Sequence, residues 1–154
     1  MQFTQGSLGR VFLIRLSHGE RMPDVLEAFA AAHAIASALV VMVGGVDDGS
    51  RIVVGPEDGT VLPPTPTVLT LSGVHEVAAV GILAPDESGE PNLHMHASFG
   101  RGEESHSGCI RAGIVTWHVL EILLLEVTGL SAARLPDPAT GFTLLRCEEA
   151  EESA

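Results

Sequence analysis

The sequence predicts an α+β domain built on a largely antiparallel sheet, with one main helix near its N-terminal end. Three observations predict this class. Several short apolar runs rich in β-branched residues alternate with turn residues, and only one segment has a clear helical pattern. The chain has 154 residues, of which 45% are hydrophobic, so it is long enough to bury one core. Strands that follow one early helix are typical of the α+β class.

The first strand and the helix are predicted at the start of the chain. Residues 11–16 form an apolar run between Gly9 and the turn 17–19, which suits a buried strand. Pro23 fits the first helical position, and Asp24 and Glu27 favour the positive end of the helix dipole. One face of this helix is expected to carry Leu26, Phe29, Ala30 and His33, with His33 packed against the helix or capping it.

The remaining elements are predicted to be strands and turns. Residues 37–43 are expected to form a hairpin with residues 51–54 through the turn at 47–50. Residues 117–127 fit a helix or a strand by pattern alone, and we favour a strand. Further strands are predicted at 68–71, 75–83, 93–99 and 141–146, with loops at 56–66 and 85–91.

Composition limits the partners and the location of the protein. The net charge is −12, and all eight basic residues are arginines that form no basic run, so nucleic-acid binding is doubtful. The N-terminus has no signal-peptide pattern, and the apolar stretch 34–46 is too short for a membrane helix. We therefore expect a cytoplasmic protein without a membrane partner, whose two cysteines are free thiols or metal ligands.

The domain is expected to span residues 1–146. Residues 147–154 form a predicted acidic C-terminal tail, which contains four glutamates and is interpreted as a solvated end.

The segment that contains His94 and His96 gives the clearest indication of chemistry in the sequence. His94 and His96 are two residues apart, and in a strand such residues point to the same side about 6.6 Å apart. The turn at 100–104 would bring either His106 or Cys109 beside them. Because 106 and 109 differ by an odd number, only one should join unless Gly108 introduces a bulge. Three such donors suit a zinc ion or another divalent transition metal. The alternative is a polar sheet face without metal.

Three stretches resemble the plants-and-prokaryotes-conserved (PPC) domain family, which is often associated with DNA binding. They are the opening strand and helix at 12–16, 19–20 and 26–29, the segment 75–81 that ends in glycine, and His94 and His96 followed by residues 107–109. The family's third histidine falls on Cys109, so the resemblance implies a His-His-Cys zinc site, with His106 as the alternative ligand. It also implies a mixed sheet with a helix across it, a homotrimer, and a metal site near the subunit boundary.

Two further residues are candidates for the site. Glu76 matches the family's glutamate and could orient a ligand or act as a catalytic base, whereas its alternative is a solvent-facing charge. Arg111 could bind a small anionic ligand, because guanidinium groups hold oxyanions in bidentate contacts.

Three functions follow from these residues. The first is a zinc-binding, trimeric PPC-domain protein with a regulatory or ligand-sensing role. Its family-level DNA-binding label is weak here, because the plant Arg-Gly-Arg-Pro hook is absent and the charge opposes phosphate. The second is a metal-dependent hydrolase or lyase that uses a metal-activated water. The third is a structural metal site.

Overall fold

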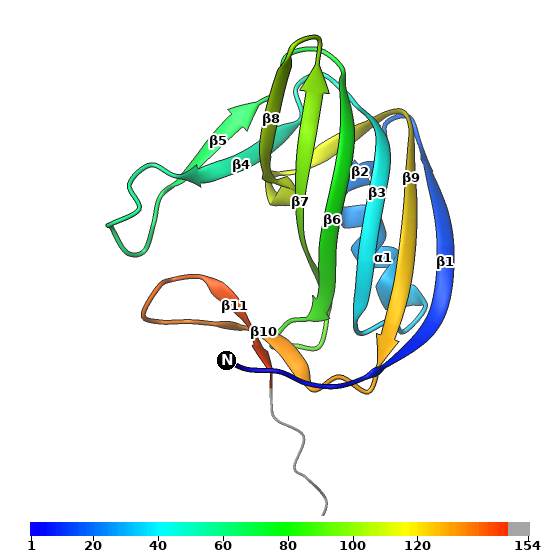
Figure 1. Ribbon diagram of the computed structural model, residues 1–154, viewed down its shortest axis with the longest axis vertical. Helices are drawn as coiled ribbons and strands as arrows, with labels where there is room; N and C mark the ends of the chain where they lie inside the picture. Colours follow the sequence, from blue (N-terminus) through cyan, green and yellow to red (C-terminus); the bar gives the residue numbers. More distant parts are fainter. Residues whose placement is uncertain (148–154) are drawn as a thin grey trace, which may run out of the picture.

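A nine-stranded antiparallel sheet organises the computed structural model, which describes residues 1–147 (Figure 1). The strand order is β1-β9-β3-β6-β7-β8-β4-β5, and the short β2 pairs with β9. The elements are β1 (Ser7–Ser17), β2 (Arg21–Met22), α1 (Asp24–Ala32), β3 (Ala38–Val46), β4 (Arg51–Pro56), β5 (Pro66–Thr70), β6 (His75–Pro85), β7 (Pro91–Arg101), β8 (Glu104–Cys109), the 3₁₀ turn η1 (Ile110–Ala112), β9 (Ile114–Thr128), β10 (Ala132–Pro136) and β11 (Thr143–Cys147).

The predicted class is confirmed, because residues 1–147 form a mostly antiparallel sheet with one α-helix. That helix follows β1 and begins directly after Pro23. All strand pairs in the described residues are antiparallel, and the one parallel contact is an isolated bridge between Asp86 and Arg134. The mixed character implied by the resemblance is therefore limited to that bridge. Residues 117–127 are a strand, as predicted, within β9.

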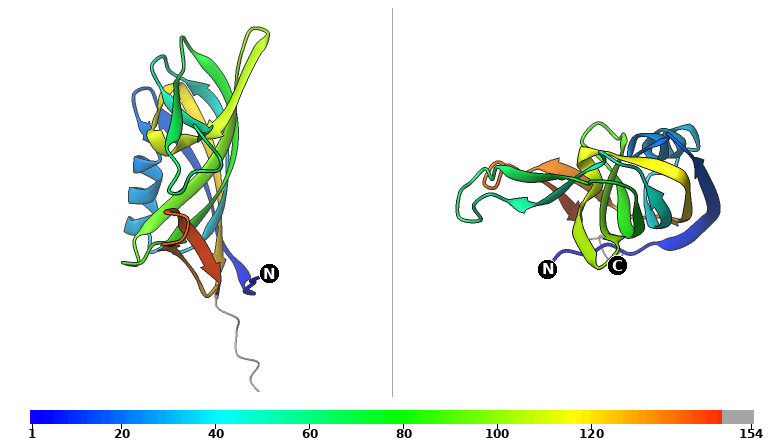
Figure 2. Two further views of the ribbon diagram at one scale, coloured as in Figure 1. Left: turned by 90° about the vertical axis from the view of Figure 1, so that its left-hand side faces the viewer. Right: turned by 90° about the horizontal axis from the view of Figure 1, so that it is seen from above.

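Helix α1 covers one face of the sheet through the side chains that its pattern predicted. Leu26 and Ala30 are buried, and the Phe29 ring meets Phe12 of β1 edge-on with ring centroids 5.4 Å apart. His33 is the C-cap residue and stacks on Phe29 with centroids 4.1 Å apart. Figure 2 shows the helix packed on one side of the sheet.

The sheet has a buried face toward α1 and a second, apolar face that is largely exposed within residues 1–147. Along β3, Ala38, Val40 and Met42 are buried, while the alternate residues are exposed. This second face, here called the open face, carries large apolar residues with 38% to 82% of their surface exposed. These residues are Leu13, Leu39, Val41, Val43, Val80, Ile82 and Leu123.

The predicted hairpin between residues 37–43 and 51–54 is wrong. Strand β3 does not stop at Gly44 and Gly45 but continues to Val46, and both of its edges are occupied, by β6 and β9. Strand β4 pairs with β5 and β8 instead. The glycines permit a bulge in the pairing with β9, where a Cβ on Gly45 would lie 2.8 Å from the Trp117 side chain.

The C-terminal segment forms a separate two-stranded sheet that the sequence predicted only in part. The strand expected at 141–146 is β11, and its partner β10 was not predicted. Cys147 ends β11, and the rest of the predicted acidic tail lies outside the described residues. Within residues 1–147, no helix has both the length and the apolar character needed to cross a membrane.

Candidate metal centre

Two neighbouring strands bring His94, His96 and Cys109 together. His94 and His96 are alternate residues of β7, and His96 lies directly opposite Cys109 in the pairing with β8. Residues opposite one another in an antiparallel pair share a face, so the three side chains project from the same side. One ligand atom from each of them lies within 4.8 Å of the others, and the two Nε2 atoms are 3.0 Å apart.

The local backbone explains the position of Cys109. The β7–β8 hairpin turns at Gly102, which adopts a φ of +60° that favours glycine. Strand β8 is only six residues long, and its last residue, Cys109, also pairs with Val53 of β4. At Gly108 a Cβ would lie 2.6 Å from the Val53 carbonyl oxygen, so glycine allows β4 to approach this end of β8.

The donor set fits a zinc ion. Zinc is commonly held by imidazole nitrogen at about 2.0–2.1 Å and thiolate sulfur at about 2.3 Å, with tetrahedral geometry. The separations among the three donors allow one ion to lie between them. Both histidines are exposed and Cys109 is buried, so the thiol lies at the floor of a surface site. Three donors leave a fourth position for an external ligand.

Positive charge surrounds this cluster. Burial lowers the pKa of the His94 imidazole, and the charges of Arg134, His96 and Arg111 lower it further. Each of these effects favours the neutral imidazole, which is the form that binds metal. Arg111 lies in η1, two residues after Cys109, and its side chain is exposed.

His106 does not join the cluster in the described chain. It lies opposite Phe99, which is fully buried, so it projects from the other side of the sheet from His96. Its ring lies 6.1 Å from that of buried His75, and both line a separate hollow of about 660 Å³. Of the two candidates for third donor, Cys109 therefore lies on the same side of the sheet as His94 and His96, and His106 does not.

Glu76 also lies apart from the three donors. It pairs with Gly100, whereas His96 pairs with Val80, four residues further along β6. Four residues of strand span about 13 Å, so this carboxylate does not reach the cluster within one chain.

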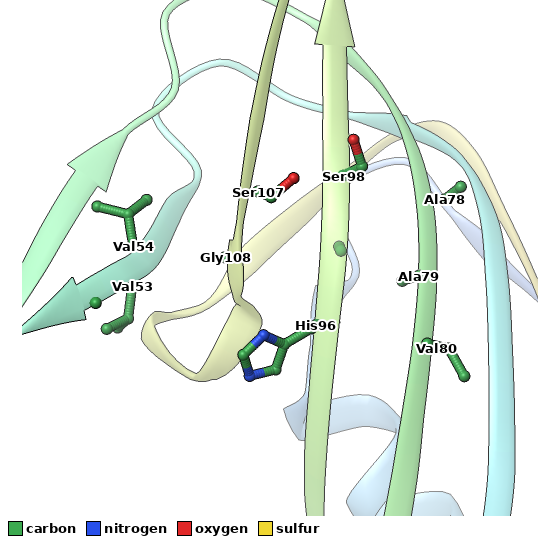
Figure 3. A pocket seen from close by; sticks show the side chains of 11 residues that line it. Val53, Val54, Ala78, Ala79, Val80, His96, Ser98, Ser107 and Gly108 are labelled. Atoms are coloured by element: carbon green, nitrogen blue, oxygen red, sulfur yellow. The ribbon is translucent and has the colours of Figure 1, made fainter.

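A hollow of about 650 Å³ adjoins His96 on the open face (Figure 3). Its walls are small or apolar, and Ser98 and Ser107 supply hydroxyl groups. The hollow is lined in part by Val53, Val54, Ala78, Val80 and Gly108.

One residue near the cluster was missed by the sequence analysis. Arg134 of β10 has only 5% of its surface exposed, and its Nη2 donates to the Ile82 carbonyl at 2.9 Å. Ile82 is the register partner of His94, which explains the influence of this charge on His94. No motif marks Arg134 in the sequence, because its position depends on how the C-terminal hairpin packs.

The fold and the donor cluster define a protein built on one large antiparallel sheet, with a candidate His-His-Cys metal centre at the surface. The chain belongs to the Plants and Prokaryotes Conserved (PCC) domain family, whose sequence pattern matches residues 3–128. The matched region contains all three donors and excludes Arg134.

Several known proteins are similar to this chain. A plant- and prokaryote-conserved protein from Pyrococcus horikoshii is 27% identical with a TM-score of 0.81, over 98% of this chain and 99% of that one. The metal-containing protein AF0104 from Archaeoglobus fulgidus has the same TM-score at 22% identity, over 94% and 98% of the two chains. A protein from Ralstonia eutropha JMP134 with a provisional DNA-binding name has a TM-score of 0.71 at 23% identity, over 88% and 90%.

A longer curated protein also matches. The bifunctional protein GlmU from Synechococcus sp. is 27% identical over 150 residues, which is 96% of this chain. The chain spans 22% of the length of that relative.

Proposed function

We propose that this PCC-domain protein binds zinc through His94, His96 and Cys109 and acts as a homotrimeric, cytoplasmic regulatory or ligand-sensing protein. The observation that carries the proposal is that ligand atoms of two imidazoles and one thiol lie within 4.8 Å of one another. The fourth position would accept a small anionic ligand, with exposed Arg111 as a nearby cation.

The open face supports self-association next to this centre. Val80 and Ile82 belong to the open face and are the register partners of His96 and His94. Large exposed apolar patches mark interaction surfaces, because leaving them in water costs free energy. A second copy that covers this face would place the metal centre near a subunit boundary.

The names of two relatives bear on whether this protein binds a metal or DNA. The Archaeoglobus protein is named as metal-containing, which supports a metal here. The DNA-binding name of the Ralstonia protein is not extended to this chain, because a net charge of −12 opposes the approach of phosphates.

A metal-dependent hydrolase or lyase is the second candidate. Three donors with an open position, beside a hollow of about 650 Å³, are typical of zinc sites that act as Lewis acids. Glu76 would not serve as the base within one chain, because about 13 Å of strand separates it from His96.

Elemental analysis of the untagged protein tests the zinc proposal. We expect one zinc per chain in the wild type, and Cys109→Ser should lose it because a ligand is removed. Loss of an outer-shell partner alone costs about 10–100-fold in metal affinity, so loss of a ligand should cost at least about 100-fold.

His106→Ala is the matched control, because His106 projects from the opposite side of the sheet. It should keep full zinc content. If Cys109→Ser keeps zinc and His106→Ala loses it, His106 is the third ligand instead of Cys109. A zinc-free wild type would refute the proposal.

A further inference from the structure

Within residues 1–147, Arg134 is a buried cation without a carboxylate partner. Its side chain forms no ion pair within 4.0 Å among residues 1–147, although the chain has a large excess of acidic residues. Two of its five N–H groups are used, since Nη2 donates to the Ile82 carbonyl and Nε donates to the Asn92 carbonyl at 3.4 Å. A buried charge costs free energy unless a counter-charge or polar groups compensate it.

Arg134 lines a polar hollow that also reaches β7, the strand of His94 and His96. This hollow has a volume of about 510 Å³, and Asn92, Ser88 and Thr143 also line it. Asn92 precedes His94 by two residues on β7, so both side chains project from the same side about 6.6 Å apart along the strand. Through Asn92, the lining of this hollow therefore reaches the strand position next to His94, on the side away from His96.

The local charge balance favours an anion at this place. A zinc ion held by two neutral imidazoles and one thiolate keeps one positive charge. Arg134 and Arg111 add one each, and both act electrostatically on His94.

Two acidic residues, Asp86 and Glu87, line the same hollow. Asp86 Oδ1 already accepts hydrogen bonds from the Ser88 amide, the Ser88 hydroxyl and the Glu90 amide within its turn. Glu87 is exposed at the tip of that turn.

We propose that Arg134 and the Asn92 side chain form, with the metal bound by His94, His96 and Cys109, a site for a small oxyanion that carries a carboxylate or phosphate group. The inference rests on the proposed zinc centre and names its ligand class. Arg134 supplies charge, the Asn92 amide supplies a neutral donor, and the metal supplies the open position. Arg134 lies on the C-terminal hairpin, outside the matched region 3–128, whereas Asn92 and the three donors lie within that region.

Calorimetric titration of the zinc-loaded protein with inorganic phosphate and with acetate tests the inference, with acetamide as the neutral counterpart of acetate. We expect at least one of the two anions to bind and acetamide not to bind. Arg134→Met should weaken anion binding at least about tenfold, as expected when a hydrogen bond to a charged group is lost. Arg146→Met is the matched control, because Arg146 lies in the same hairpin but pairs with Asp137, and it should bind as the wild type does.

Asn92→Ala keeps the carbonyl that binds Arg134 and decides the question if Arg134→Met fails to fold. It should weaken anion binding several-fold while zinc content stays at one per chain. Zinc-loaded protein that binds neither anion, or binds them equally well in all variants, would overturn this inference and leave the zinc centre standing. A wild type that takes up no zinc would overturn both.

Discussion

At the scale of single residues, Glu126 shows how one carboxylate can join two strands. Its side chain is 9% exposed, and Arg10 of β1 forms a bidentate ion pair with it, in which both N–O distances are 2.7 Å. The Arg10 amide also donates to Glu126 Oε2 at 2.9 Å. The hydrogen bonds from the Arg10 side chain and amide hold the pKa of the Glu126 carboxyl at about 2, below its ordinary value of 4.5.

The lowered pKa predicts a loss of stability in acid. A carboxyl with a lower pKa in the folded chain stabilises the fold fully above its unfolded pKa, and this contribution is lost as the pH falls from about 5 toward 2. Urea unfolding at intervals across that range should show a steeper decline in the wild type than in Glu126→Gln, which has no carboxyl there to titrate. Parallel declines in the two proteins would contradict the prediction.

At the scale of strands, the lack of a side chain at Gly81 of β6 allows β7 to lie close to β6 beside the metal donors. A Cβ at this position would lie 2.6 Å from the Met95 Cβ and 2.8 Å from the His94 carbonyl oxygen. A methyl group would therefore displace the backbone that carries His94. We expect Gly81→Ala to lower the free energy of unfolding by about 1–3 kcal/mol, as overpacking does, and to weaken zinc binding.

Gly100 provides the matched control for that substitution. It lies in the neighbouring strand β7, and a Cβ there would meet nothing within 4 Å. Gly100→Ala should change the free energy of unfolding by no more than about 0.5 kcal/mol, measured by urea denaturation beside Gly81→Ala. Equal effects of the two substitutions would show that close packing at Gly81 is unimportant.

Sequence patterns predicted strands better than they predicted strand partners. Alternation and β-branched content identified the segments that became β6, β7 and β9. The pairing of residues 37–43 with 51–54 was wrong because the turn at 47–50 is a local signal. The partners of β3 lie far away in the sequence, at β6 and β9. Strand β10 was missed because five residues ending in proline have no distinct period.

At the scale of the whole molecule, the open face predicts a homo-oligomer. Val80 is 56% exposed at the centre of this face, next to His96. Val80→Glu would place a charge in a subunit contact, where burial without a partner is unfavourable. Light scattering coupled to size exclusion should give the mass of a trimer for the wild type and a smaller mass, at least partly that of a monomer, for the variant.

Ala28→Glu is the control for that substitution, because Ala28 is exposed on α1, which covers the opposite side of the sheet. It should keep the wild-type mass. A monomeric wild type, or a Val80→Glu variant with unchanged mass, would contradict the prediction.

The sequence by itself determined the class of fold, the early helix and the pairing of His94 with His96, because these depend on periodicities of a few residues. For a regular strand, parity also predicted that only one of His106 and Cys109 would join the histidines. Tertiary structure decided which one, since that depends on the register of β7 with β8. It also decided the positions of Glu76 and Arg134 relative to the donors, because sheet order and hairpin packing join segments that are far apart in the chain.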